Sequence, residues 1–292
     1  MRRKPIHYFQ RDWHIVSYKP FYLKGTEYLF RGPEPDLNKP YFSCVGAAQT
    51  FGCLCEDPYP NLLSEDIELP VLNLGFGGAG ALFFENKELL NTINKGKFAV
   101  IQIMSGRNES NSLLNSRNGV VPLYRTADKK KLTPPDAYKW LLENHDLATV
   151  KKVVEETRES WVQSYKSLLS HITVPTILFW FSKRSPDYTE TYDTSADLLG
   201  NFPHLVNRAM IQKVSPKANF FVECTMEEYS FRYINRFTGN PTSIVLEYFD
   251  GKRKTRSHEF YYPSPRMHKE ASKMLLEPSK KALDMHQAAT PA

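Results

Sequence analysis

Short apolar runs that end in small or polar residues recur along most of the chain. Each is bounded by Gly, Ser, Asn or Pro, a pattern typical of buried parallel strands with loops at their carboxyl ends. The runs predict a first strand that ends at Val45 and four more at Pro70–Leu74, Phe98–Met104, Pro175–Ser182 and Asn219–Thr225.

Segments with apolar residues at helical spacing separate these runs. We expect helices after Pro58, over 133–144, 147–171 and 198–214, and again from Pro263. Strands that alternate with helices predict an α/β fold built on a mostly parallel sheet. In such a sheet the carboxyl ends of the strands lie together, so their loops can share one crevice.

Several segments lie outside this alternation. Residues 1–40 are rich in aromatics and form an N-terminal extension, and a polar, basic stretch at 112–131 forms a surface excursion or lid within a helical insertion of about 112–170. Residues 243–262 predict a β-hairpin that turns at Asp250-Gly251. The main domain then spans 41–278, followed by a flexible tail at 279–292.

Charge and cysteine content narrow the class of protein. The 38 Lys and Arg residues against 32 Asp and Glu give a net charge of +6, spread along the chain, which favours an anionic small ligand or acidic glycan over nucleic acid. Cys44, Cys53, Cys55 and Cys224 lack a second pair at zinc spacing, so we expect reduced thiols and no metal site. The basic residues 1–7 lack the apolar core of a signal peptide and no run reaches about 18 apolar residues, so we expect a cytoplasmic protein without a transmembrane segment.

Basic residues follow the third and fourth predicted strands. Arg107, Arg117, Lys183 and Arg184 would add positive charge to the crevice, where guanidinium groups suit phosphate, sulfate or carboxylate. The alternative is that Arg107 pairs with Glu109 and that Lys183 and Arg184 are simply the first solvated residues after a buried strand.

Five blocks taken together resemble the SGNH (GDSL-type) hydrolase superfamily over roughly residues 41–276. The blocks are Gly46-x-x-x-Thr50-x-Gly52, Pro58-Tyr-Pro-Asn-Leu-Leu, Val71-Leu-Asn-Leu-Gly-Phe-Gly-Gly78, Gly106-Arg-Asn108-Glu109 and Tyr262-Pro-Ser-Pro-Arg-Met-His268. The resemblance implies a three-layer sandwich with a flavodoxin-like, five-stranded sheet. The chain is also similar to an uncharacterised bacterial domain family linked to surface-polysaccharide biosynthesis.

The departures from that superfamily affect its catalytic residues. Its first block carries a nucleophilic serine where this chain has Ala48, and its last block carries a histidine base where this chain has Tyr262. A serine nucleophile needs an adjacent imidazole, so serine-esterase chemistry is not expected and the chain resembles a degenerate member. Gly78 and Asn108 match the residues that donate hydrogen bonds to an oxyanion.

Other residues remain candidates for the crevice. His204 is a possible replacement base at the start of a helix, where a capping or core role is the alternative, and Glu259 and His258 are further catalytic candidates. Gln49, Thr50, Ser105 and Tyr262 are candidate substrate contacts.

Three classes of function are compatible with these residues. The first is a transferase that moves a sulfuryl or acyl group onto a surface glycan from a 3'-phosphoadenosine-containing donor, either 3'-phosphoadenosine 5'-phosphosulfate (PAPS) or a coenzyme A thioester, with no tightly bound cofactor. No phosphate-binding motif identifies that donor. The second is a non-catalytic glycan-binding or regulatory pseudo-hydrolase. The third is a hydrolase with relocated machinery, which requires a histidine within hydrogen-bond reach of Ser105 or Ser182.

Overall fold

A five-stranded parallel sheet forms the centre of the computed structural model, which describes residues 5–228, 230–247 and 253–289. Its strands are β3 (Phe42–Gly46), β4 (Val71–Gly75), β5 (Ala99–Gln102), β9 (Thr176–Ser182) and β10 (Phe220–Thr225). They pair in the order β10-β9-β5-β3-β4. Counted along the sheet's own strands, this is the flavodoxin-like order 2-1-3-4-5, so the predicted fold class is confirmed.

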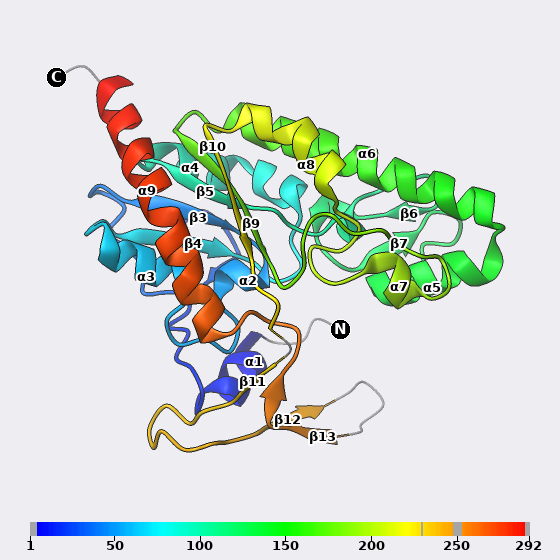
Figure 1. The fold of residues 1–292 in the computed structure, drawn as a ribbon, viewed down its shortest axis with the longest axis horizontal. Helices are drawn as coiled ribbons and strands as arrows, with labels where there is room; N and C mark the ends of the chain where they lie inside the picture. Colours follow the sequence, from blue (N-terminus) through cyan, green and yellow to red (C-terminus); the bar gives the residue numbers. More distant parts are fainter. Residues whose placement is uncertain (1–4, 229, 248–252, 290–292) are drawn as a thin grey trace.

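Helices cover both faces of this sheet and make the three layers (Figure 1). On one face lie α3 (Tyr59–Asp66) and α9 (Pro265–Ala289), and on the other lie α4 (Lys87–Lys95), α6 (Leu147–His171) and α8 (Arg208–Val214). The strands are apolar on both sides because side chains alternate between the faces. In β9, Phe179 packs toward α3 and α9, whereas the neighbouring Trp180 packs toward α6 and α8.

Shorter elements join the layers and extend the fold. They are α1 (Pro5–Asp12), β1 (Phe21–Tyr22), β2 (Leu29–Phe30), α2 (Ala48–Phe51), η1 (Ala81–Glu85), η2 (Gly106–Asn108), β6 (Leu114–Asn115), η3 (Arg117–Gly119), β7 (Leu123–Arg125), β8 (Lys131–Leu132), α5 (Pro134–Asn144), α7 (Ser195–Leu199), η4 (Ser215–Lys217), β11 (Phe231–Arg232), β12 (Ile244–Glu247), β13 (Arg253–Arg256) and β14 (His258–Glu259).

The chain between β5 and β9 builds a lobe at one end of the sheet (Figure 1). The stretch predicted as a surface excursion contains β6, β7 and β8, which pair as a small antiparallel sheet. This sheet shares an apolar cluster with α5, α7 and the first part of α6, in which Leu114, Leu123, Tyr138 and Leu198 are fully buried. The lobe therefore has a core of its own beside the central one.

The single helix predicted over 198–214 is wrong. Helix α7 ends at Leu199, and α8 begins only at Arg208. Gly200 has a φ of 62°, and Pro203 has no amide hydrogen for a helical bond, so the chain between the helices forms a loop. His204 therefore lies in the loop 200–207 and not at a helix start.

The two ends of the chain also differ from the prediction. Helix α9 continues through Pro278 to Ala289, where the sequence predicted a flexible tail, because Ser279 and Ala282 keep a buried face against the sheet. At the other end, the extension contains helix α1 as well as the short strands β1 and β2. Its Phe30 is fully buried in the main core, so this segment covers the sheet.

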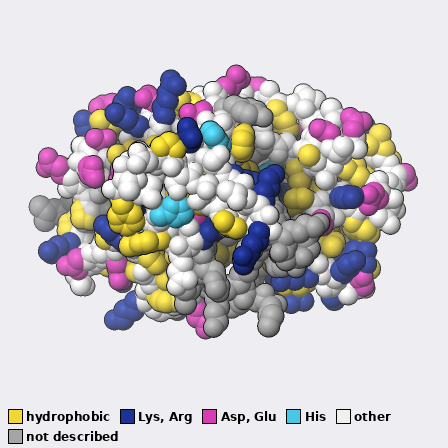
Figure 2. All heavy atoms as spheres, turned by 90° about the horizontal axis from the view of Figure 1, so that it is seen from below, with side chains coloured by type: hydrophobic (Ala, Val, Ile, Leu, Met, Phe, Trp, Pro, Cys, Tyr) yellow, Lys and Arg dark blue, Asp and Glu magenta, His cyan; other side chains and the backbone are white. Residues whose placement is uncertain are grey.

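The predicted hairpin is confirmed, since β12 and β13 pair antiparallel. Its Asp250-Gly251 turn lies outside the described residues. Lys and Arg side chains are scattered among Asp and Glu on the face shown in Figure 2, without an extended basic stripe among the described residues. No helix in the part of the chain that the structure describes combines the length and apolar character needed to cross a membrane.

Candidate functional site

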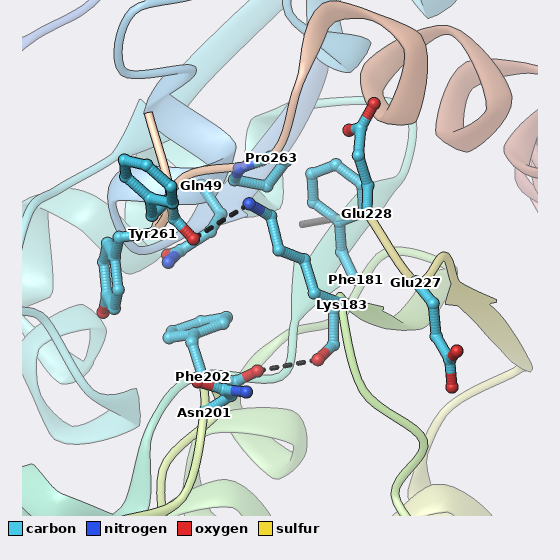
Figure 3. Close-up of a pocket in the computed structure, with 11 residues that line it drawn as sticks. Gln49, Phe181, Lys183, Asn201, Phe202, Glu227, Glu228, Tyr261 and Pro263 are labelled. Carbon is cyan, nitrogen blue, oxygen red and sulfur yellow. Dashed lines mark hydrogen bonds between the residues drawn. The ribbon is translucent and has the colours of Figure 1, made fainter. Parts of the chain in front are cut away.

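Two pockets open where the loops after β5 and β9 meet the loops 200–207 and 260–263. The Lys183 pocket has a volume of about 510 Å³, and its lining includes Gln49, Phe181, Lys183, Asn201, Phe202 and Tyr261 (Figure 3). The Arg107 pocket has a volume of about 590 Å³, and its lining includes Arg107, Arg184, Tyr188, Asp197, Asn201 and His204. Asn201 lines both, so the two pockets adjoin.

Aromatic rings, the Lys183 ammonium group and the side chains of Glu227 and Glu228 line the Lys183 pocket. Phe260 and Tyr261 line the pocket and are 49% and 39% exposed. The Nζ of Lys183 donates to the Phe260 carbonyl at 3.0 Å (Figure 3). Burial lowers the pKa of Lys183, and the charges of Glu228 and Glu259 oppose that shift. Exposed rings beside a few polar groups suit a sugar ring.

Gln49 adds an unsatisfied polar atom to the same pocket. Its side chain is 2% exposed, and its Oε1 has no hydrogen-bond partner among the described residues. A buried amide oxygen without a partner favours a ligand that brings a donor, such as a hydroxyl group.

Glu259 shapes the loop that carries these aromatic rings. Its Oε1 accepts the backbone N–H groups of Phe260, Tyr261 and Tyr262 at 3.1, 2.8 and 3.3 Å, and its Oε2 accepts the Tyr233 hydroxyl at 2.6 Å. The Glu259 carboxylate therefore holds the loop 260–263 in place. It lines neither pocket, and nor does His258, which lies in β14 with its Nδ1 3.0 Å from the Ser257 hydroxyl.

His204 lies between the two pockets. Its Nδ1 is 2.8 Å from the Ser105 Oγ, its Nε2 is 3.0 Å from Nη1 of Arg107, and its ring stacks on Tyr261 at 6.0 Å. Burial, followed by the charges of Arg107 and Arg184, lowers the pKa of His204 well below its usual range, so the ring is neutral.

The contacts of His204 assign its tautomer. Arginine only donates hydrogen bonds, so Nε2 accepts and Nδ1 carries the proton. Nδ1–H therefore donates to the Ser105 Oγ, which also accepts the His204 backbone N–H at 3.2 Å. Ser105 meets the distance that a relocated hydrolase requires, but its histidine donates to it and takes no proton from it.

The three predicted arginines have different surroundings. The Arg184 guanidinium donates to the carbonyls of Asn201, Ser185 and Val206 at 2.9, 3.0 and 2.8 Å, and to that of Pro203, so it holds the loop 200–207 in place. Arg107 lines the pocket, and its Nε has no partner within the described chain. Arg117 is exposed on η3, 4.1 Å from the Tyr124 ring, and lines neither pocket.

Ala48 and Tyr262, which match the superfamily's nucleophile and base, line a third pocket of about 260 Å³. The other lining residues are mostly apolar and include Phe51, Phe76 and Gly77. Burial raises the pKa of Tyr262 well above its usual range, so its hydroxyl stays neutral. The two positions come together as the resemblance implies, but in an apolar setting without an imidazole.

Asn108 and Gly78, the two positions that match oxyanion donors of the superfamily, contact each other. The Asn108 Nδ2 donates to the Gly78 carbonyl at 2.8 Å, and Gly78 adopts a φ of 82°. Thr50 is buried, and its hydroxyl donates to Gln102 Oε1 at 2.7 Å, which anchors the turn after β3. These three residues stabilise the loops around the site, and none of them lines the Lys183 or the Arg107 pocket.

Sequence reasoning missed the residues that bring the two pockets together. Tyr261, Phe260, Asn201 and Phe202 were not singled out, although Tyr261 stacks on His204 and Asn201 lines both pockets. The only available signal was proximity in sequence, because Tyr261 precedes Tyr262 and Asn201 lies three residues before His204.

A protein-family comparison matches residues 7–117 and 141–282 to the family described as Domain of unknown function (DUF6473). The chain belongs to this family. The unmatched residues 118–140 contain β7, β8 and the start of α5, so the family match omits part of the lobe. None of the curated proteins matches the chain.

Solved structures similar to the chain include carbohydrate esterases and a lipase. A carbohydrate esterase family 2 enzyme from Corynascus thermopiles (Myceliophthora fergusii) is 13% identical, with a TM-score of 0.41 over 87% of this chain and 69% of that one. A family two carbohydrate esterase from Clostridium thermocellum, in complex with cellohexaose, is 12% identical, with a TM-score of 0.41 over 88% and 68%. A lipase from a goat rumen metagenome is 13% identical, with a TM-score of 0.38 over 84% and 97%.

Proposed function

We propose that the chain transfers a sulfuryl or acyl group from a 3'-phosphoadenosine-containing donor to a hydroxyl group of a surface glycan. The supporting observation is the position of His204, whose neutral ring contacts Arg107 in one pocket and Tyr261 in the other. Direct transfer requires one base and a positive group for the departing phosphate. His204 and Arg107 meet that requirement without a serine nucleophile.

In this proposal the glycan occupies the Lys183 pocket and the donor occupies the Arg107 pocket. The acceptor hydroxyl reaches from the Lys183 pocket into the adjoining Arg107 pocket and loses its proton to His204 Nε2, while its oxygen attacks the sulfur of the sulfuryl group. An oxygen–sulfur bond forms, the bond from sulfur to the donor phosphate breaks, and Arg107 stabilises the phosphate that keeps the electron pair. With an acyl donor the carbonyl carbon is attacked, and the coenzyme A thiolate leaves with the pair.

The remaining features are compatible with this role. The resemblance to SGNH hydrolases and to a family linked to surface polysaccharides supports a glycan acceptor. All four cysteines are free and buried, which is compatible with a reducing compartment, and we propose that the reaction occurs in the cytoplasm.

Thermal denaturation with candidate ligands tests the proposal. We expect adenosine 3',5'-bisphosphate and coenzyme A to raise the melting temperature, and AMP and sulfate to do so less. A ligand at a hundred times its Kd stabilises the fold by about 2.7 kcal/mol. The Arg107→Met variant should lose the effect, and Arg117→Met, a matched change outside the pockets, should keep it. If no nucleotide shifts the melt, the donor proposal is wrong.

A second candidate is a non-catalytic glycan-binding protein. Two observations favour it. Ala48 and Tyr262, at the positions of the nucleophile and base, lie in an apolar pocket. The Nε2 of His204 already accepts a hydrogen bond from Arg107. Acidic or neutral oligosaccharides would then shift the melt while nucleotides would not. A Lys183→Met variant would lose that shift, because Lys183 lines the proposed glycan pocket.

A further inference from the structure

The nitrogen of His204 that would act as the base already accepts a hydrogen bond. Nε2 of His204 accepts a hydrogen bond from Arg107 Nη1 at 3.0 Å, so its lone pair is not available to a substrate. We propose that Arg107 is an anion-operated latch on His204: an anionic group of the donor draws the guanidinium away and frees Nε2 to accept a proton. This inference rests on the proposed function, whose base and donor it uses.

The side chain of Arg107 is held weakly compared with its backbone. Gly106 N–H donates to the His204 carbonyl at 2.9 Å, and Glu109 N–H donates to the Gly106 carbonyl at 3.0 Å, so the segment around Arg107 is fixed. Within the described residues, however, its guanidinium forms no ion pair with a carboxylate, and its Nε has no partner. A phosphate or sulfate group would offer the guanidinium two parallel bonds to charged oxygens, in place of a single bond to the uncharged Nε2. It is therefore favourable for the Arg107 guanidinium to leave His204 Nε2 and bind the anion.

His204 keeps its position when Arg107 leaves. Its Nδ1–H and its backbone N–H both donate to Ser105 Oγ, and its ring packs between Tyr261 and Phe202 at 6.0 Å from each. The freed lone pair then faces the space that Arg107 occupied, within the pocket that would hold the donor.

The charges around His204 make the latch electrostatic as well as steric. Ser105 and Arg107 follow β5, Arg184 follows β9, and Tyr261 belongs to the loop 260–263, while Asp197 and Tyr188 line the same pocket. The positive charges of Arg107 and Arg184 both lower the pKa of His204.

An anion bound to Arg107 offsets its positive charge and therefore raises the pKa of His204. Arg184 stays in place, because its guanidinium bonds the carbonyls of the loop 200–207. The base thus strengthens only when a donor is bound.

Nitrogen-15 NMR of the histidine side chains tests the latch directly, with the His204 signals assigned by their loss in His204→Gln. Without ligand, we expect the Nδ1–H tautomer. Saturating adenosine 3',5'-bisphosphate, or inorganic sulfate as the minimal anion, should raise the proton affinity of His204 by about tenfold or more. Arg107→Met should show the raised affinity without ligand and no response to the anions, and Arg117→Met should behave as the unmodified protein.

Two results would overturn the latch. One is a His204 titration that does not respond to either anion in the unmodified protein, and the other is an Arg107→Met variant whose His204 titrates as before. The latch and the proposed function can fail separately. If His204 responds to the anions but no group is transferred, the latch holds and the transferase proposal is wrong. If group transfer occurs without a His204 response, the latch is wrong and the transferase proposal stands.

Discussion

The Ser105 Oγ lies 2.8 Å from the His204 Nδ1 and 3.2 Å from the His204 backbone nitrogen. One hydroxyl thus accepts two hydrogen bonds from the same residue, while Arg107 donates to the opposite ring nitrogen. This polarity is the reverse of a serine nucleophile with its base. Ser105 orients the imidazole and is not expected to attack a substrate.

Replacing Ser105 by alanine tests that orienting role. The change leaves two buried N–H donors of His204 without an acceptor, so the fold should lose about 1 to 3 kcal/mol of unfolding free energy. Transfer should fall without being abolished, because His204 keeps its stacking on Tyr261. A fluorophosphonate probe should leave the unmodified protein unlabelled, and covalent labelling at Ser105 would contradict the assignment.

The matched nucleophile position gives a second prediction. Ala48→Ser should not create esterase activity, since the neighbouring Tyr262 is a neutral phenol with a raised pKa and cannot serve as the base at neutral pH. Hydrolysis of p-nitrophenyl acetate should stay at the rate of the unmodified protein. A large rate increase in this variant would show that a base reaches the position after all.

Glu259 should be one of the most sensitive residues near the site. Its buried carboxylate accepts three backbone N–H groups and the Tyr233 hydroxyl. Glu259→Gln weakens charged hydrogen bonds and turns an amide N–H toward donors, so we expect a loss of roughly 2 to 4 kcal/mol in urea denaturation. Glu65→Gln, at an exposed position on α3, is the control and should change stability by less than about 0.5 kcal/mol. Equal effects of the two changes would contradict the positioning role.

Glu109 should make stability depend on pH. Burial raises its pKa from 4.5 to about 7, opposed by hydrogen bonds from Ser164 and Ser160. The folded state therefore holds this proton more tightly than the unfolded state, so its contribution is present in full at low pH and is lost as pH rises through 7.

Between pH 5 and pH 8 the unmodified protein should lose about 2 to 3 kcal/mol more than Glu109→Gln, whose side chain does not ionise. Urea denaturation of both proteins at the two pH values measures the difference. If the unmodified protein and Glu109→Gln showed the same pH dependence, the ionisation of Glu109 would not lower the unfolding free energy and the prediction would be wrong.

The sheet was predictable because each strand is a compact apolar run with a polar end. Phe179 and Trp180 are buried on opposite faces, so their run is continuous and unmistakable. The loop 200–207 was missed because the apolar residues around it keep a helical spacing, although Gly200 and Pro203 are helix-breaking residues that are visible in the sequence.

The site depended on that loop. Arg107 and His204 were both singled out, but they come from distant segments, and their contact requires the loop 200–207 to fold back onto the end of β5. Arg184 was predicted to bind an anion from its place after a buried strand, whereas its guanidinium bonds the loop's carbonyls, a tertiary contact that no local pattern indicates.

The central claim is direct group transfer with His204 as the base. The most direct measurement is the transfer of label from [³⁵S]PAPS or [¹⁴C]acetyl-coenzyme A to a panel of oligosaccharides by the purified protein. We predict labelled oligosaccharide with one of these donors, a rate roughly 10² to 10⁴ times lower for His204→Gln, and an unchanged rate for His171→Gln at an exposed position on α6. A His204→Gln variant that transfers as fast as the unmodified protein, or a protein that binds a donor and transfers nothing, would contradict the account.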